Sequence, residues 1–534
     1  MRTIFLVLIF LLHTSLQLSA QLWTLEQKMG SSDHEAGDNL GISLAVSDTF
    51  MIAGAWLEDH DENGNNRIVD AGAAYFYKIN SSGQWEVIQK VVAPNRTRSD
   101  YFGFAVDIDG DLAVVGCHNE DTDIGPNVGK AYVYRRDIGD LWVLEDTLKA
   151  NDPSNGDVFG KAVAISGDYA LIGSPNNNTD ENGANSLAEA GAAYLFKRDA
   201  NQTWAQIAKL VPQDRAMGDV FGASVALDGF ALLICALEKD ESNINLRTGL
   251  VYGTNFETAM DFEQIDNGDL QRIFASRVGV RDLFGNGLVV SGDWAFLGAA
   301  AGESDDSGFG RANGHGYFFK WENGSWMEKQ VVFPPDPDNS GSFGFAADMD
   351  GGVAVVGAAT TTSDAMNANP VAGAGAAHIY ELQPDDSWIE VEKIAGSERN
   401  FLDNYGAAVG VSGDRIWVGA WDADTVNGTT LLAGGALYSY QRAWALSVNE
   451  LAALSHLDIQ WKHELDQILL QNRGGQTEQL KANLFSLDGR QIWSSSIEIS
   501  DRWEKRFEEI PAGLYLFHLE KEGFLPLHLK LIKK

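Results

Sequence analysis

Two loops of this 534-residue chain place oxygen-bearing side chains at the spacing that calcium-binding loops use. Residues 59–70 and 178–189 share the pattern Asp/Asn-x-Asp-x-Asn-Gly-x5-Asp/Glu. Alternate oxygens can converge on one ion, the glycine allows a sharp turn, and the last carboxylate completes the coordination shell. The helices that flank an EF-hand are absent, so the alternative is a pair of polar turns. The pattern predicts calcium ligands at Asp59, Asp61, Asn63, Asp70, Asn178, Asp180, Asn182 and Glu189.

Motifs of catalysis are missing from the sequence. It contains no HExxH, GxSxG or CxxC, and no histidine stands in a pattern that pairs it with a nucleophile. Gly125 to Lys130 is one residue short of a phosphate-binding loop and precedes a predicted strand. We therefore predict that the protein is not an enzyme and has no catalytic residues.

The calcium-type loops belong to a unit that returns seven times, at intervals of 57 to 63 residues. A second small residue follows each opening glycine by thirteen positions, and it is Gly in six copies and Cys235 in the other. A period of this length indicates a chain assembled from copies of one supersecondary unit. The opening pairs are Leu40-Gly41, Phe102-Gly103, Phe159-Gly160, Phe221-Gly222, Phe284-Gly285, Phe343-Gly344 and Tyr405-Gly406.

Each copy is predicted to form four β-strands. In the copy that begins at Phe159, alternating apolar runs are separated by turns rich in Gly, Asn and Asp, and no later segment sustains a helical period. Four strands in each of seven copies predict an all-β fold, a seven-bladed β-propeller over residues 21–445. Both calcium-type loops then connect the second and third strands of their blades, and should emerge on one face.

Tryptophan spacing predicts how the ring closes. A Trp lies 18 residues before the next opening glycine in most copies, and Trp23 has the same relation to Gly41. Residues 21–29 should therefore be the outer strand of the last blade, which removes an open sheet edge. An Asp also stands three residues before the opening glycine in six copies, and we interpret it as a turn residue rather than a ligand.

The repeats resemble the FG-GAP family of integrin-α-like propeller repeats. The segment from Phe159-Gly160 to Gly173-Ser174-Pro175 is the fullest match. Integrin-type repeats carry a calcium loop between these two elements, whereas this chain has a short Ser166-Gly167-Asp168 hairpin there. The calcium residues that the resemblance implies therefore do not transfer to those hairpins.

Composition and the N-terminus indicate an exported protein. Residues 1–20 combine Arg2, an apolar run and a small-residue end, which is typical of a signal peptide. The formal net charge is −36, and the acidic excess lies within the propeller. Such a surface repels nucleic acid and anionic membranes and suits divalent or cationic partners, although solubility alone also explains it. No segment is long and apolar enough for a transmembrane helix.

The C-terminal part reads as a separate small β-sandwich, Ig-like, over residues 457–534, after a linker at 446–456. It resembles the type A C-terminal sorting domain of the type IX secretion system of Bacteroidetes. The matching pieces are Leu487-Asp488-Gly489-Arg490, the phrase from Ile510 to Leu516 and the basic terminal strand. The resemblance implies contact with the secretion machinery and a secreted or outer-membrane surface-attached protein.

Three functional hypotheses follow. The first is a surface or secreted binding or adhesion module that recognises an unknown protein or glycan through one propeller face, stabilised by calcium. The second is an extracellular propeller enzyme that acts on glycans. The third is a passive structural or matrix component. The missing catalytic motifs favour the first.

Overall fold

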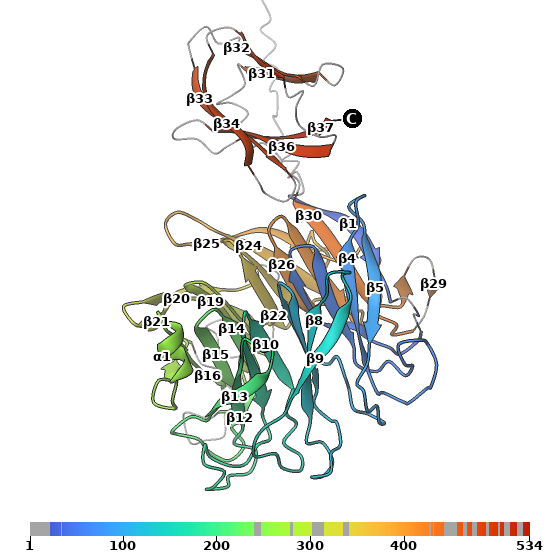
Figure 1. The fold of residues 1–534 in the computed structure, drawn as a ribbon, viewed down its shortest axis with the longest axis vertical. Helices are drawn as coiled ribbons and strands as arrows, with labels where there is room; N and C mark the ends of the chain where they lie inside the picture. Colours follow the sequence, from blue (N-terminus) through green and yellow to red (C-terminus); the bar gives the residue numbers. More distant parts are fainter. Residues whose placement is uncertain are drawn as a thin grey trace, which may run out of the picture. The chain divides into compact units, whose positions relative to one another are not determined.

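A computed structural model describes residues 22–31, 33, 35–239, 247–277, 281–301, 314–334, 341–426, 429–430 and 432–442, together with seven C-terminal strands between residues 457 and 533. The predicted signal peptide at 1–20 and linker at 446–456 lie outside these residues. The chain divides into two compact units, one of which is Trp23–Arg442. Each unit is an independent body (Figure 1).

The unit Trp23–Arg442 is a seven-bladed β-propeller, as predicted. It contains seven four-stranded antiparallel sheets, and each innermost strand neighbours the innermost strands of the two adjacent blades in a closed ring (Figure 1). The innermost strands are β2 (Leu40–Ser47), β6 (Val106–Asp109), β10 (Ala162–Ser166), β14 (Phe221–Asp228), β18 (Phe284–Ser291), β22 (Phe343–Asp350) and β26 (Tyr405–Ser412). The second strands are β3 (Phe50–Ala55), β7 (Leu112–Cys117), β11 (Tyr169–Ser174), β15 (Ala231–Ala236), β19 (Trp294–Ala299), β23 (Val353–Ala358) and β27 (Arg415–Ala420).

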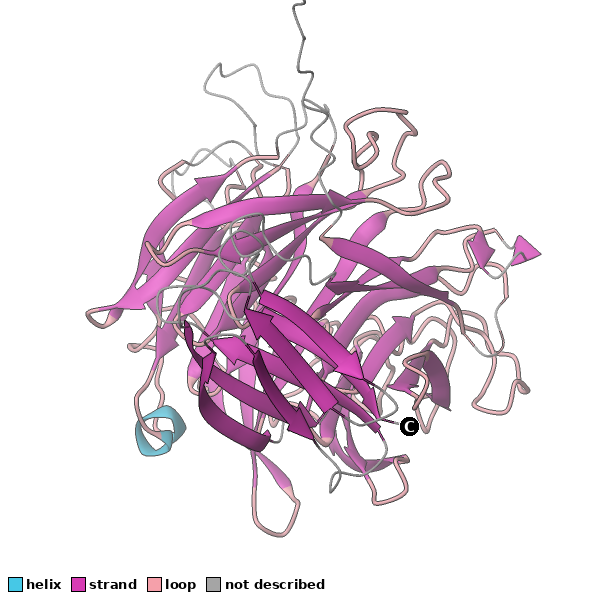
Figure 2. Cartoon of the chain, turned by 90° about the horizontal axis from the view of Figure 1, so that it is seen from above, coloured by secondary structure: helices cyan, strands magenta, loops and turns pink. Residues whose placement is uncertain are grey.

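The outer half of each blade follows after a long loop. The third strands are β4 (Ala73–Ile79), β8 (Lys130–Arg136), β12 (Ala192–Arg198), β16 (Leu250–Asn255), β20 (His315–Glu322), β24 (Ala376–Leu382) and β30 (Ala436–Arg442). The outer strands are β5 (Trp85–Val91), β9 (Trp142–Leu148), β13 (Trp204–Leu210), β17 (Gln271–Ile273), β21 (Ser325–Val332), β25 (Trp388–Ile394) and β1 (Trp23–Met29). The described residues contain one helix, α1 (Ala259–Glu263), and a small hairpin of β28 (Thr425–Val426) and β29 (Thr429–Thr430) (Figure 2).

The N-terminal strand closes the ring, as its tryptophan predicted. β1 pairs with β30 in antiparallel register, with Trp23 opposite Arg442, and Trp23 is fully buried. Figure 1 shows the two strands side by side, although they lie at opposite ends of the propeller sequence. Trp23 N also donates to Glu392 of the sixth blade, and Gln27 exchanges two hydrogen bonds with the Trp85 backbone of the first. One strand therefore joins the last blade to both of its neighbours.

The repeated glycines mark the places where neighbouring blades meet backbone to backbone. A Cβ atom on Gly54 would lie 1.8 Å from the carbonyl oxygen of Gly103, and one on Gly173 would lie 2.1 Å from that of Gly222. The opening glycines also have φ near +90°, a conformation that side chains disfavour, as at Gly160 with +89°. The two glycines of each repeat therefore allow inner strands of adjacent blades to approach more closely than any other residue would permit.

The predicted turn role of the repeated aspartates is also confirmed. Each of five carboxylates accepts a hydrogen bond from the backbone N–H three residues before it, within the loop that leads into the inner strand. They bond to one another's backbone in no case, and each serves its own loop. The pairs are Asp38 with Glu35, Asp100 with Thr97, Asp157 with Ser154, Asp219 with Ala216, and Asp403 with Asn400.

The C-terminal strands form one three-stranded and one four-stranded antiparallel sheet. Their bounds are β31 (Leu457–Lys462), β32 (Gln467–Asn472), β33 (Glu478–Ser486), β34 (Gln491–Ile499), β35 (Arg502–Arg506), β36 (Gly513–Glu520) and β37 (Leu527–Lys533). The rings of Trp493 on β34 and Trp503 on β35 lie 6.1 Å apart. The predicted Ig-like sandwich over residues 457–534 stays a prediction.

Replacing Gly173 with alanine tests the contact between blades. We expect Gly173→Ala to lower the free energy of unfolding by about 1–3 kcal/mol, because the new methyl group would overlap a backbone carbonyl that has no side chain to rotate away. Gly139→Ala is the control, since its Cβ would meet only the Asp137 carboxylate, at 3.3 Å. Denaturant unfolding of the two variants measures the difference, and equal stabilities would contradict the proposed contact.

Candidate functional site

The long loops of the propeller emerge at one end of the blades. The loops between second and third strands, such as 56–72 and 175–191, lie at the end where the preceding outer strand leads into the next inner strand. The opposite end carries two-residue hairpins such as Gly167-Asp168 between β10 and β11. We call the first end the loop face. Both calcium-type loops belong to it, as the sequence predicts.

In the first of these loops, Asp61 bonds to the loop itself. Its Oδ1 accepts hydrogen bonds from the backbone N–H groups of Asn63 (2.9 Å) and Asn65 (2.8 Å), and its Oδ2 accepts one from Asn66 Nδ2 (2.5 Å). These bonds hold the pKa of Asp61 below its usual value, with the Asn65 N–H as the largest cause. The carboxylate therefore fixes the turn.

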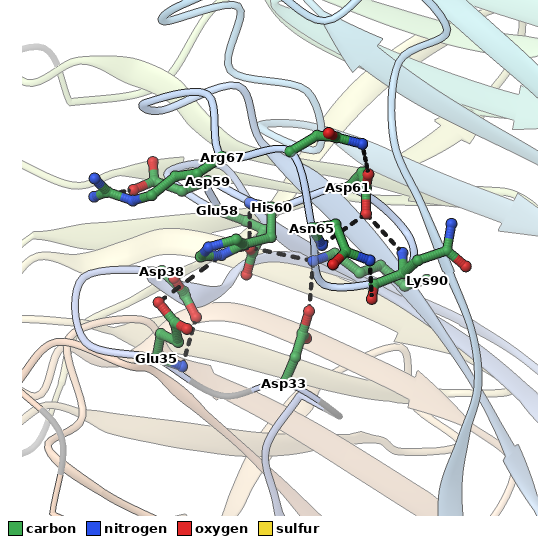
Figure 3. Close-up of polar contacts among 12 residues, drawn as sticks. Asp33, Glu35, Asp38, Glu58, Asp59, His60, Asp61, Asn65, Arg67 and Lys90 are labelled. Carbon is green, nitrogen blue, oxygen red and sulfur yellow. Dashed lines mark hydrogen bonds and ion pairs between the residues drawn. The ribbon is translucent and has the colours of Figure 1, made fainter.

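The other predicted ligands of this loop have similar tasks. Asp59 Oδ1 accepts a hydrogen bond from Asp70 N at 2.7 Å, while its Oδ2 lies 2.5 Å from Arg67. The backbone carbonyl of Asn65, at the position where an EF-hand loop uses a main-chain oxygen, accepts from Asp61 N at 2.8 Å. Figure 3 shows Asp61 turned toward Asn65 and Asp59 paired with Arg67. Asn63 donates through Nδ2 to Glu62.

The second loop repeats this geometry almost atom for atom. Asp180 accepts from Asn182 N (2.9 Å), Ala184 N (2.8 Å) and Asn185 Nδ2 (2.5 Å). Asn178 Oδ1 accepts from Glu189 N at 2.8 Å, which matches the Asp59–Asp70 bond. All eight predicted residues therefore lie in two equivalent loops, four in each.

A third copy of this loop, which the calcium pattern missed, occurs in the sixth blade. Asp364 accepts from Met366 N, Ala368 N and Asn369 Nδ2 at 2.7–2.9 Å. Met366 and Gly373 stand where the first loop has Asn63 and Asp70, so the loop adopts this conformation without the full ligand set. The sequence feature that finds all three copies is Asp-x4-Asn, with Asp seven residues after the second repeated glycine.

An arginine ties each of these three loops to the loop that follows the outer strand. Arg96 donates to the carbonyl oxygens of Asn66 (3.0 Å) and Asp59 (2.6 Å). The equivalent donors are Arg215, to Asn185 and Asn178, and Arg399, to Asn369 and Thr362. Each arginine lies 35 residues after its aspartate. A fixed cation thus holds together the two kinds of loop that form the loop face.

Calcium at these loops stays a prediction. Among the residues that the structure describes, no group of three or more His, Cys, Asp or Glu side chains is arranged to hold a metal ion, and Asp59, Asp61 and Asp70 are included in that search. The bonds above give the carboxylates a role that needs no ion. Calcium binding would require them to exchange N–H donors for the ion.

A buried acidic cluster lies beneath the first loop. Glu58 is fully buried, and Asp38 is 4% exposed. Lys90 Nζ lies 2.6 Å from Asp33 and 3.2 Å from Glu58, and His60 Nδ1 lies 3.4 Å from Glu58 (Figure 3). The Tyr75 hydroxyl donates to Asp33 at 2.7 Å. Burial, with the Glu58 carboxylate as the second cause, raises the pKa of Asp38 to about 8.

The propeller axis holds a cavity of about 540 Å³ that is lined by all seven inner strands. Asp107 and Asp348 project into it from the second and sixth blades, and burial raises the pKa of each to about 7. Both carboxylates bridge inner strands, since Asp107 accepts from Ile165 N and Asp348 from Val411 N, at 2.7 Å. They are therefore part of the framework between blades.

Comparison with known families identifies the repeat. A model described as FG-GAP repeat matches residues 23–77, 85–134, 142–196 and 204–252. This chain carries FG-GAP repeats. Each matched segment begins at the outer strand of one blade and ends within the third strand of the next, so an FG-GAP repeat spans two blades. The FG-GAP propeller is thus interlocked at every seam, and β1 is the first strand of its first repeat.

Solved structures add only distant similarities. A putative 6-phosphogluconolactonase from Bacteroides fragilis is 9% identical, with 86% of this chain and 98% of that chain covered and a TM-score of 0.36. The periplasmic gluconolactonase of Pseudomonas aeruginosa is 14% identical, with coverages of 81% and 94% and a TM-score of 0.36. A DUF3244 family protein with an immunoglobulin-like fold from Bacteroides vulgatus is 12% identical, covering 15% of this chain and 84% of its own, with a TM-score of 0.14. No curated protein matches the FG-GAP chain.

The acidic cluster makes the stability of the FG-GAP propeller depend on pH. Because the folded-state pKa of Asp38 exceeds its unfolded value, its contribution to the free energy of unfolding should fall as pH rises from about 4 to about 8. Asp38→Asn keeps an acceptor for Glu35 N and a donor for Glu58, and should flatten this dependence. Melting at pH 5.5 and 8.0 measures the effect. Asp140→Asn, at a carboxylate with a lowered pKa, is the control, and a parallel response of both variants would contradict the assignment.

Melting also separates a calcium site from a turn. If calcium binds, it should raise the melting temperature of the mature chain and a chelator should lower it, and Asp61→Ala plus Asp180→Ala should abolish the response. Asp364→Ala is the matched control, because that carboxylate caps the same turn without the predicted ligands. If all three positions only cap turns, the variants should lose stability equally with calcium and with chelator.

Proposed function

We propose that the FG-GAP chain is an exported binding or adhesion module that recognises its ligand with the loop face of the propeller. The observation that carries this proposal is the asymmetry between the two ends of the blades. One end has only short hairpins. The other presents seven long loops, three of which are braced by an arginine and an internally bonded aspartate. Bracing of this kind keeps a loop surface in one conformation, which lowers the entropic cost of binding.

Export and attachment are parts of the same proposal. A signal peptide at 1–20 and a sorting domain of the type IX secretion system at 457–534 would deliver the propeller to the medium or to the outer-membrane surface. The secretion machinery is then a partner of the C-terminal domain. No helix among the described residues is long and apolar enough to cross a membrane. Calcium at the two predicted loops would add stability outside the cell.

Blocking each end of the propeller in turn tests the role of the loop face. Both natural cysteines, Cys117 and Cys235, are buried, so an introduced cysteine can carry a bulky polymer selectively. Glu62→Cys places the polymer at the exposed tip of the first calcium-type loop, and Asp293→Cys places it on a hairpin of the opposite end. We expect binding to host or bacterial cells and to arrayed glycans to fall about tenfold or more only with the polymer at position 62.

Two results would contradict the proposal. Equal binding by both conjugates would mean that the loop face is not the recognition surface. Turnover of an arrayed glycan by the unmodified chain would favour the enzyme hypothesis instead.

A further inference from the structure

Five side chains from three adjacent blades meet where the inner strands begin at the loop face. Trp56 follows β3, Tyr101 and Phe104 flank the turn that leads to β6, His118 follows β7, and Lys161 precedes β10. The Trp56 ring centroid lies 4.9 Å from that of Tyr101 and 5.5 Å from that of Phe104, and the His118 ring lies 4.7 Å from Phe104. We call these residues the mouth cluster, since the axial cavity begins two residues farther along the strands, at Val106 and Val163.

Lys161 is a cation without an anionic partner. Its Nζ lies 3.7 Å from the centroid of the Phe104 ring, and among the described residues no carboxylate oxygen lies within 4 Å of it. Burial lowers the pKa of Lys161 to about 8. A cation–π contact satisfies one side of an ammonium group, which has three N–H donors, and removal from water costs free energy unless those donors are bonded.

Other lysines that point into the propeller differ in this respect. Lys90, Lys209 and Lys239 each lie within 2.8 Å of an aspartate oxygen. In a chain with a net charge of −36, a half-buried lysine without a carboxylate is an exception that packing between blades does not require. Its free donors are available to an anion that comes from outside the protein.

His118 supplies a second unsatisfied group at the same place. Its side chain is 5% exposed, and its Nδ1 atom is buried without a hydrogen-bond partner among the described residues. Burial, together with the nearby Lys161 charge, lowers the pKa of His118 to about 3, so the ring is neutral near pH 7. A neutral imidazole can donate or accept one hydrogen bond, as a hydroxyl group requires.

The remaining members of the mouth cluster are aromatic rings that keep part of their surface exposed. Trp56, Tyr101 and Phe104 are each only half-buried, although they lie near the axis of the propeller. Flat apolar rings beside hydrogen-bonding groups and one cation match a ligand that has an apolar face, hydroxyl groups and a negative charge.

We propose that the mouth cluster binds an acidic sugar, which is a pyranose ring that carries a carboxylate or a sulfate. The aromatic rings contact the apolar face of the sugar, the Lys161 ammonium bonds the anionic group, and His118 bonds a hydroxyl. This proposal rests on the binding role of the loop face and gives that role a ligand class and a centre. The negative charge of the remaining propeller surface disfavours anions that cannot reach Lys161.

Calorimetric titration of the mature chain tests the proposal with three probes of equal length. These are an oligosaccharide of galacturonic acid, a sulfated galactose oligosaccharide and the neutral galactose oligosaccharide. We expect at least one acidic probe to bind and the neutral probe to bind about tenfold more weakly or not at all. The two acidic arms distinguish a carboxylate from a sulfate ligand.

Paired charge variants locate the site. Lys161→Gln should weaken binding of the acidic probe about tenfold, because it removes the ammonium and leaves a neutral side chain of similar length. Lys149→Gln removes the same charge from an exposed position and should change the affinity less than about twofold. Phe104→Leu should also weaken binding while it preserves most apolar volume, and melting temperatures identify any variant that fails to fold.

The outcomes separate this inference from the broader function. Failure of every acidic probe to bind, equal binding of the neutral probe, or equal effects of the two lysine variants would overturn the inference. The loop face would still be a recognition surface if the polymer at position 62 blocks binding of another ligand. It would lose that role only if the polymer has no effect on any bound ligand.

Discussion

Backbone contact between neighbouring blades is the constraint on which the rest of the propeller depends. The second repeated glycine of one blade lies against the carbonyl of the opening glycine of the next, as Gly173 does with Gly222. This approach brings seven inner strands close to one axis and leaves a cavity of about 540 Å³ between them. It also fixes where the loops begin, because the same glycines stand at the loop-face ends of the first two strands. The positions of the braced loops and of the mouth cluster follow from this contact.

Interlocking at the outer rim complements the contact at the axis. An FG-GAP repeat contributes the outer strand of one blade and three strands of the next, so a blade is complete only when its neighbour is present. Paired hydrogen bonds such as those between Gln89 and the Trp142 backbone recur at the rim. β1 makes the same contacts at the last seam, which gives the final blade the same environment as the others.

The loop face combines two uses of charge. Near its outer part, carboxylates are bonded to loop N–H groups or paired with cations, as Asp61 and Asp33 are, so they shape the surface. At the centre, Lys161 faces aromatic rings and has no such partner. Charges that are already satisfied stabilise loops, whereas an unsatisfied charge in a partly desolvated place is available for a ligand. This contrast directs the functional argument to the axis rather than to the acidic loops.

The sequence by itself determined the number of blades, the strand that closes the ring and the face that carries the long loops. These follow from local spacing: a glycine at a fixed offset, a tryptophan 18 residues before it, and loop lengths. It also located the loops at Asp61 and Asp180, but only the tertiary structure showed their bonds, because Arg96 and Arg215 reach them from another loop 35 residues away. The mouth cluster was equally invisible, since its members come from three blades and have no common motif. Spacing along the chain reports what each blade repeats, whereas contacts across blades exist only after the ring has closed.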